Sequence, residues 1–361
     1  MVIPTDPTKS DVIEVRPDEK FNEANLSQFI KGKFPGSELS LTVKQFGGGA
    51  ANLTYDLQFG NSYEYVLRRP PLGPVAKSAH DMGREYKVLS VLHQEFPYAP
   101  RAFLYSDDPA IIGAPFFIMD RKRGIVIRKH IPEEFINKPE LGRTISEEMV
   151  DRLVDFHSVN YKKLGLEDLG KPDGFIERQV EGWYNRWNKA KHQEFKVMDD
   201  LYQWLRTHIP KTDEYTLLHN DYKLDNMMLD NKLEKIVAIF DWDMCTLGDP
   251  FSDLGALLAY WYDAQHDQPY MKAITTMPSE DIKFVTRKEL IQRYEEKSGR
   301  SVHNISFYHT LGLFRLVVII AQIYIRFVRG QTQDKRFAGL GQMIPLIAQS
   351  AMDVATGKLQ Y

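Results

Sequence analysis

Apolar and polar positions alternate along the N-terminal part of the chain. Between residues 41 and 67 the apolar positions are Leu41, Val43, Tyr55, Leu57, Phe59, Tyr63, Tyr65 and Leu67. A period of two is typical of strands with one buried face. The pattern therefore predicts three short strands: one before the glycine triplet at 47–49, one between that triplet and the turn at 60–61, and one that ends at Arg68.

Helical spacing frames these strands. Residues 22–34 place Leu26, Phe29 and Ile30 on one side, which indicates an amphipathic helix. Residues 78–96 show the same spacing, and the segments 102–108 and 115–127 are apolar enough for two more strands. We expect a small antiparallel lobe that ends near Met119.

From residue 145 onward the pattern is mainly helical, with long amphipathic segments at 145–161, 175–190 and 195–209. The expected fold class is α+β, with a nucleotide-binding lobe at 1–119 and a larger, mainly helical lobe at 120–361. The most apolar run, 313–327, contains Arg315 and Arg326 and falls short of the ~20 apolar residues that a membrane span needs. It predicts a buried helix instead.

Composition narrows the class of protein. Of 361 residues, 46 are Lys or Arg and 49 are Asp or Glu, so the net charge of -3 disfavours nucleic acid as a partner. Cys245 is the only cysteine, which excludes a disulfide within the chain and favours a reducing, cytoplasmic location. We expect its thiol to be a small buried apolar group. The polar N-terminus lacks the pattern of a secretion signal, so we expect none, and we expect no membrane partner.

Candidate chemistry is concentrated in HNDYKLDN, residues 219–226. A carboxylate beside a hydroxyl can accept its proton as the oxygen attacks phosphorus, which makes Asp221 the candidate catalytic base. Lys223 could place its ammonium against the transferred phosphoryl group. Asp and Asn also favour turns for local hydrogen-bonding reasons, so a solvated acidic turn is the alternative.

Two further side chains suit a metal ion. Asn226 offers an amide oxygen, and Asp241 follows the apolar strand expected at 235–240. Mg²⁺ is a hard cation that prefers oxygen ligands, so Asn226 and Asp241 are its candidate ligands. The crowding of acids is then explained, because one acid would accept a proton and another would bind magnesium.

These motifs resemble known loops. His219-x-Asp221 with Asn226, a hairpin and Asp241 resembles the catalytic and metal-binding loops of protein-kinase-like phosphotransferases. HNDYKLDN with IFDWD and GDPFSDLG is similar to the aminoglycoside phosphotransferase-like family, which phosphorylates small molecules. VLRRPP at 66–71 and FIERQVEGWYNRW at 175–187 are most similar to the branch that also occurs fused to acyl-CoA dehydrogenases. The resemblance implies a bilobal protein-kinase-like fold and the use of ATP and Mg²⁺.

The resemblance also implies a nucleotide site. The backbone N–H groups of Gly48 and Gly49 would close over the phosphates, with Asn52 nearby, although three glycines also make an ordinary hairpin turn. Arg68 occupies the position of the usual lysine, and Glu85 on the next helix is its expected partner. A surface salt bridge between them is the alternative. Met119 lies at the expected hinge between the lobes.

Supporting roles are assigned to four other residues. We expect His219 to support the loop, and the resemblance implies that Asp253 hydrogen-bonds that loop and holds it in place. His157 lies among apolar residues on a predicted helix, which favours a buried, hydrogen-bonded histidine. Asp243 could be a second metal contact or a structural acid.

The acceptor segment is expected to be aromatic and basic. It holds Trp183, Tyr184, Trp187, Tyr202 and Trp204 with Arg178, Arg186 and Arg206. Such walls suit a partly apolar anion better than a polycation, and the fused relatives suggest a hydroxyacyl-CoA. The basic run 121–130 could attract an anionic substrate or could simply be solvated.

The leading hypothesis is an ATP- and Mg²⁺-dependent phosphotransferase that acts on a small-molecule hydroxyl. A non-catalytic nucleotide-binding scaffold is the alternative, because Arg68 departs from the kinase pattern. A protein kinase is disfavoured, since the chain passes from Asp241 directly to GDPFSDLG without a long activation segment. The sequence does not identify the acceptor or the oligomeric state.

Overall fold

The computed structural model describes residues 12–47, 52–72, 81–136, 138–212, 214–267, 271–275, 277–332 and 334–359. Contacts divide these residues into two compact units. The smaller unit holds the described residues up to Ile125, together with Met227–Lys232 and Ile236–Cys245, and the larger unit holds the rest. The predicted Gly48 and Gly49 lie outside the described residues.

A six-stranded antiparallel sheet forms the frame of the smaller unit, within the described residues. Its strand order is β1-β2-β3-β4-β6-β5. The strands are β1 (Val12–Ile13), β2 (Leu41–Phe46), β3 (Leu53–Phe59), β4 (Tyr63–Arg69), β5 (Ala102–Ser106) and β6 (Phe116–Asp120). The three strands predicted from the period of two are confirmed as β2, β3 and β4.

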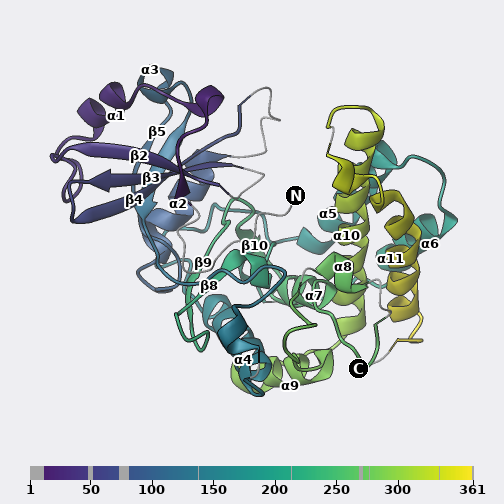
Figure 1. Cartoon of the computed structure of the whole chain (residues 1–361). Helices are drawn as coiled ribbons and strands as arrows, with labels where there is room; N and C mark the ends of the chain where they lie inside the picture. The colour runs from purple at the N-terminus through teal and green to yellow at the C-terminus, as the bar shows by residue number, and fades with distance from the viewer. Residues whose placement is uncertain are drawn as a thin grey trace. The chain divides into compact units, whose positions relative to one another are not determined.

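The two faces of this sheet serve different purposes. On one face, Tyr65 and Leu67 join an apolar core with the short helices α1 (Glu23–Ile30) and α3 (Pro109–Ile112) (Figure 1). Because side chains alternate along a strand, Arg68 points to the opposite face. There it meets α2 (Met82–Leu92), the helix that the sequence predicts after the third strand.

A separate hairpin of β8 (Met227–Leu229) and β9 (Ile236–Ile239) also belongs to the smaller unit. The backbone N–H of Ile239 donates to the carbonyl of Tyr98 at 2.8 Å. On the other strand, Ile125 and Leu229 form a β-bridge with two backbone hydrogen bonds of 2.8 Å. The segment that leads to Asp241 is therefore tied to the small sheet unit by main-chain bonds.

Helices make up most of the larger unit. They are α4 (Leu141–His157), α5 (Phe175–Ala190), α6 (Lys196–Thr207), α7 (Phe251–Ala259), α8 (Met271–Thr275), α9 (Arg287–Ser298), α10 (Ile305–Val328) and α11 (Leu340–Ala355). Figure 1 shows α4 beside α9, and α10 beside α11. Two short strands, β7 (Thr216–Leu218) and β10 (Thr246–Gly248), pair antiparallel. Single turns occur at η1 (Pro17–Glu19), η2 (Glu133–Phe135), η3 (Leu224–Asn226) and η4 (Lys335–Phe337). An antiparallel sheet in one unit and helices in the other confirm the α+β class.

The backbones of α7 and α10 approach closely at two glycines. A Cβ atom on Gly255 would lie 2.3 Å from the carbonyl oxygen of Tyr308, and one on Gly312 would lie 2.5 Å from the carbonyl oxygen of Gly255. Neither position has room for a side chain. This contact fixes α7, which carries Asp253, against α10, which carries Arg315.

Helix α10 is also long and apolar enough to cross a membrane by length and composition, although 56% of its most apolar stretch is buried inside the protein. Its residues from Phe307 to Ala321 are almost all buried. The buried helix expected at 313–327 is confirmed as far as Ala321, and beyond it the helix is partly exposed.

Candidate active site

Asp253 holds the start of the 219–226 loop. Its Oδ2 accepts the backbone N–H of His219 at 2.6 Å, and its Oδ1 accepts the backbone N–H of Asn220 at 2.7 Å. Asn220 has a φ of 63°, a left-handed conformation that asparagine tolerates better than most residues. These bonds confirm the role expected for Asp253, whose side chain is fully buried.

A buried histidine orients this carboxylate in turn. The Nε2 atom of His157 lies 3.4 Å from Asp253 Oδ2, and its Nδ1 lies 2.8 Å from the hydroxyl of Tyr294. Burial lowers the pKa of His157 despite the neighbouring carboxylate. Burial opposes ionisation of Asp253, but its hydrogen bond with His157 and the other lowering contacts prevail, so the pKa of Asp253 is lowered overall. His157 is the hydrogen-bonded core histidine that the sequence predicts.

Within the loop, two side chains donate to the predicted base, Asp221. Lys223 Nζ lies 2.9 and 2.8 Å from the two carboxylate oxygens. Asn226 Nδ2 donates to Asp221 Oδ2 and to its carbonyl oxygen, both at 2.8 Å. Burial disfavours the charged amine, but the Asp221 carboxylate raises the pKa of Lys223 overall. Asp221, Lys223 and Asn226 are thus gathered in one cluster of the larger unit.

The smaller unit holds a second cluster around Arg68. Its Nη1 lies 2.8 Å from Glu85 Oε1, and its Nη2 lies 2.9 Å from Asp241 Oδ1. Burial disfavours the charged guanidinium, yet the two carboxylates raise the pKa of Arg68 above its usual value. The salt bridge between Arg68 and Glu85 is therefore buried, and the surface alternative is wrong.

The backbone around Asp241 is constrained. Asp241 has a φ of 70°, which is rare for a residue with a side chain. The indole N–H of Trp242 donates to the carbonyl of Ile239 at 2.8 Å, and Arg84 on α2 donates to the carbonyl of Cys245 at 2.8 Å. Cys245 is fully buried, as predicted. Helix α2 thus contacts the segment that follows Asp241.

The predicted nucleotide contacts are placed in part. Asn52 is 6% exposed, and its amide atoms make no hydrogen bond within the described residues. The Nε of Arg68 also lacks such a partner there. Met119 is buried in β6, between β4 and β5. Buried donors without partners fit a polar ligand such as a phosphate.

Asn226 and Asp241 are the predicted metal ligands; Asn226 belongs to the larger unit and Asp241 to the smaller unit. The nitrogen of the Asn226 amide donates to Asp221, which leaves its oxygen as the ligand atom. In the part of the chain that the structure describes, no three His, Cys, Asp or Glu side chains form a metal cluster. An amide and a carboxylate still fit Mg²⁺, because phosphates and water complete its shell in kinases.

The predicted acceptor wall is only partly correct. Trp187 is 1% exposed and belongs to the core of its unit. Arg206 pairs with Glu181 at 3.2 Å, and Glu181 also accepts the hydroxyl of Tyr202. Arg178 donates to the carbonyls of Lys171 and Asp173. Their donors are used within the protein, and Trp183 is also buried, which leaves Arg186 as the stronger candidate of these residues.

The basic run 121–130 is largely neutralised by acids. Arg121 pairs with Asp56 at 2.7 Å, and Lys122 pairs with Asp120 at 2.9 Å. Arg123 forms an ion pair with Glu64. These partners favour the structural interpretation of the run over attraction of an anionic substrate.

Arg315 and Tyr260 are contacts of the 219–226 loop that the sequence did not assign. Arg315 Nη2 donates to the carbonyl of Asn220 at 2.8 Å. Lys223 Nζ lies 5.1 Å from the ring centroid of Tyr260. The sequence did offer one indication of a role for Arg315. It is a charged residue inside the apolar run 313–327, and a buried arginine needs a specific partner.

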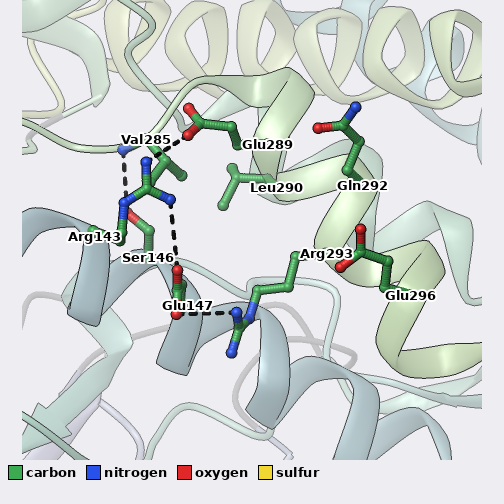
Figure 2. Close-up of a pocket in the computed structure, with 9 residues that line it drawn as sticks. All are labelled: Arg143, Ser146, Glu147, Val285, Glu289, Leu290, Gln292, Arg293 and Glu296. Atoms are coloured by element: carbon green, nitrogen blue, oxygen red, sulfur yellow. Dashed lines mark hydrogen bonds and ion pairs between the residues drawn. The ribbon is translucent and has the colours of Figure 1, made fainter.

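A pocket elsewhere in the larger unit has a volume of about 180 Å³ (Figure 2). It lies between α4 and α9 and contains none of the predicted site residues. Arg143 on α4 reaches Glu289 on α9 at 2.6 Å and Glu147 on its own helix at 3.5 Å, and Arg293 on α9 reaches Glu147 at 3.0 Å. Its charges neutralise one another, as in a salt-bridge network that joins two helices.

Comparison with known proteins gives a consistent family. The model of the phosphotransferase enzyme family matches residues 42–275. Acyl-CoA dehydrogenase family member 11 from Homo sapiens is 31% identical over 356 residues, which cover 96% of this chain and 45% of that protein. The chain thus spans less than half the length of this relative.

Solved structures agree on the fold. A protein from Ralstonia eutropha, provisionally assigned as an aminoglycoside phosphotransferase, is 26% identical with a TM-score of 0.80 over 95% of this chain and 100% of its own. Spectinomycin phosphotransferase in complex with ADP and spectinomycin is 14% identical with a TM-score of 0.57 over 91% of this chain and 98% of its own. The bilobal protein-kinase-like fold expected from the sequence is confirmed.

Proposed function

Because the chain belongs to the phosphotransferase enzyme family, we propose that it moves the γ-phosphoryl group of ATP to a hydroxyl of a small molecule. One observation carries this proposal most directly. Asp221 is held by Lys223 and Asn226 in a loop whose backbone is anchored on the buried Asp253. Such a braced carboxylate is what a hydroxyl nucleophile requires.

In this mechanism Asp221 accepts the proton of the acceptor hydroxyl as its oxygen attacks the γ-phosphorus. The bond between the γ-phosphorus and the bridging oxygen of ADP breaks in the same displacement. Lys223, 2.8 Å from Asp221, stabilises the negative charge that gathers on the transferred group. Catalysis then comes from positioning and electrostatic stabilisation.

The nucleotide is assigned to the smaller unit. Asn52 and the Nε of Arg68 supply buried donors without partners in the described residues. Gly48 and Gly49, which the sequence assigns to the same site, lie outside those residues. Met119 is assigned to the wall of the adenine site. Arg68 replaces the usual lysine, keeps the expected ion pair with Glu85 and forms a second one with Asp241, which supports a working site over a degenerate one.

Magnesium is assigned to the oxygens of Asn226 and Asp241. When bound, the ion would neutralise charge on the phosphates. Arg68 restrains the Asp241 carboxylate, and Asp221 restrains the Asn226 amide. Both candidate ligands are therefore oriented before any ion arrives.

A hydroxyacyl-CoA is the proposed acceptor. The support is that this chain, which matches the phosphotransferase family model, is also similar to proteins named acyl-CoA dehydrogenase family members. A non-catalytic nucleotide-binding scaffold remains the second candidate, favoured by the single observation that Arg68 stands where a lysine is usual.

Replacement of Asp221 by Asn separates these two candidates. The assay is acceptor-dependent ADP formation, screened first with hydroxyacyl-CoAs, and Asp200→Asn on the exposed face of α6 is the matched control. We expect Asp221→Asn to lower kcat by about 10²–10⁴, the range attributed to a general base. ADP affinity, measured by calorimetry, should stay within about twofold because no donor to the nucleotide is removed.

Equal turnover in Asp221→Asn and the wild type would exclude Asp221 as the base. Binding of ADP without turnover across the whole acceptor screen would favour the scaffold.

A further inference from the structure

Two arginines share one tryptophan ring in the larger unit. The guanidinium carbon of Arg186 lies 4.4 Å from the centroid of the Trp183 ring, and that of Arg315 lies 5.2 Å from it. Arg186 and Trp183 come from α5, whereas Arg315 comes from α10. The ring attracts both cations, but it carries no net charge to cancel them.

Neither arginine forms an ion pair within the described residues. Arg315 is 7% exposed, and the only hydrogen bond of its side chain there goes to the Asn220 carbonyl. Arg186 makes no hydrogen bond or ion pair there and is exposed. Burial lowers the pKa of Arg315 overall, although Tyr260, Asp253 and Asp221 act in the opposite direction. A buried charge is normally paired, so two close cations without a carboxylate in direct contact favour an external anion.

This pair lies against the candidate catalytic loop. The carbonyl that Arg315 binds belongs to Asn220, the residue directly before Asp221. Asp221 itself is engaged by Lys223. Arg315, which forms no ion pair among the described residues, therefore lies beside the residue that would receive the acceptor.

We propose that Arg315 and Arg186, held beside the Trp183 ring, bind an anionic group of the acceptor, a carboxylate or a phosphate. This inference rests on the proposed function and specifies the acceptor class of that same site. Guanidinium groups suit both anions because they donate two parallel hydrogen bonds. A polycationic acceptor would be repelled here.

A purely structural role is the competing explanation for Arg315, because its bond to Asn220 also supports the loop. It does not account for Arg186, whose exposed side chain contacts the Trp183 ring but makes no hydrogen bond or ion pair among the described residues. Arg186→Gln is therefore the informative variant, since it removes the charge without removing a bond that the fold uses. Arg206→Gln is its matched control, because Arg206 is paired with Glu181.

Calorimetry tests the proposal, with ADP present at saturation to occupy the nucleotide site. The probes are coenzyme A, 3-hydroxybutyrate and the uncharged pantetheine. We expect coenzyme A or 3-hydroxybutyrate to bind the wild type and Arg206→Gln equally, and Arg186→Gln at least about tenfold more weakly. Pantetheine should bind all three proteins equally weakly. The two charged probes distinguish a phosphate from a carboxylate as the recognised group.

Arg315→Lys serves as a second variant, because it keeps the charge and removes the paired geometry. It should weaken the anionic probe and leave the ADP-induced rise in Tm unchanged.

The proposal is overturned if neither charged probe binds the wild type, or if Arg186→Gln binds them as tightly as Arg206→Gln does. Failure of the proposed function has a different outcome. Arginine-dependent anion binding without phosphoryl transfer to any acceptor would remove the phosphotransferase and leave the anion site. Efficient phosphoryl transfer to an uncharged alcohol, unaffected by Arg186→Gln, would support the phosphotransferase and remove the anion site.

Discussion

Asp253 accepts the backbone N–H of His219 at 2.6 Å, and both groups are buried. A carboxylate that accepts two backbone N–H groups fixes a loop more firmly than a turn sequence alone. The position of Asp253 depends on α7, which packs closely against α10 at Gly255, where no side chain would fit. The geometry at Asp221 is thus set by residues that never touch a substrate.

Replacement of Asp253 by Asn tests this support. An amide presents an N–H₂ group to one of the two backbone N–H donors, so one donor loses its acceptor inside the protein. We expect the free energy of unfolding to fall by about 1–3 kcal/mol, the usual result of one unsatisfied buried group. Urea unfolding measures this, with Asp200→Asn as a surface control that should stay within about 0.5 kcal/mol. Equal stabilities of the two variants would contradict the proposed support.

Protonation of His157 should couple stability to pH. Burial lowers the folded pKa of His157 below its ordinary value of 6.5, so the unfolded chain takes up a proton first as the pH falls. The stability that His157 contributes is complete above pH 6.5 and is lost progressively below it. The loss should approach about 1.4 kcal/mol per pH unit.

Urea unfolding of the wild type and His157→Gln between pH 5 and 7.5 measures this effect. The difference between the two proteins is needed because burial raises the pKa of Glu85, which makes stability fall as the pH rises. Taking the difference removes that opposite contribution. Parallel pH profiles for the two proteins would show that His157 does not titrate differently on folding.

The strands of the smaller unit were predictable because one buried face leaves a period of two in the sequence. Asp221, Lys223 and Asn226 were predictable as a cluster because five residues of chain cannot place them far apart. Arg315 was not, because its partner Asn220 is 95 residues away and only the fold brings them together. Trp187 was misjudged, since an aromatic residue at helical spacing has the same pattern whether it faces a pocket or a core.

The pattern of apolar and polar residues also did not predict that Asp241 belongs to the smaller unit. Sequence order places it among the helices of the larger unit, but main-chain bonds from Ile239 to Tyr98 and between Ile125 and Leu229 join its hairpin to the smaller unit. Such long-range backbone pairing leaves no periodic pattern in the sequence.

Two glycines in helices should respond oppositely to alanine. Gly255→Ala would place a methyl group 2.3 Å from the carbonyl oxygen of Tyr308, and backbone cannot yield as a flexible side chain can. We expect a loss of about 1–3 kcal/mol, as for other overpacked sites. Gly182→Ala in α5 meets no other atom within 4 Å and should gain about 1 kcal/mol from helix propensity. Thermal unfolding of the two variants measures the contrast, and a gain for both would contradict the close contact of α7 and α10.

Removal of Arg68 should leave Glu85 as an uncompensated buried acid. Arg68→Met is expected to destabilise the protein by about 3–5 kcal/mol, because the partner charge then stays buried alone. The double variant with Glu85→Gln should recover part of that loss, as the buried charge is gone. Arg123→Met, whose ion pair with Glu64 is exposed, is the control and should change little. A double variant no more stable than Arg68→Met would show that the pair does not act as a unit.

Ligand binding should raise the unfolding temperature only when nucleotide and metal act together. Ligand at about 100 times its Kd adds about 2.7 kcal/mol to the folded state, which raises Tm by a few degrees for a chain of this length. We expect this shift in the wild type with ATP and Mg²⁺, and its loss with ATP and EDTA. Asp241→Asn keeps the size of the side chain and removes its charge, so it should retain little of the Mg²⁺-dependent part, whereas Asp200→Asn should behave as the wild type. A full shift in Asp241→Asn would remove Asp241 from the metal site, and no shift in any protein at millimolar ATP would mean that Arg68 does not replace the lysine.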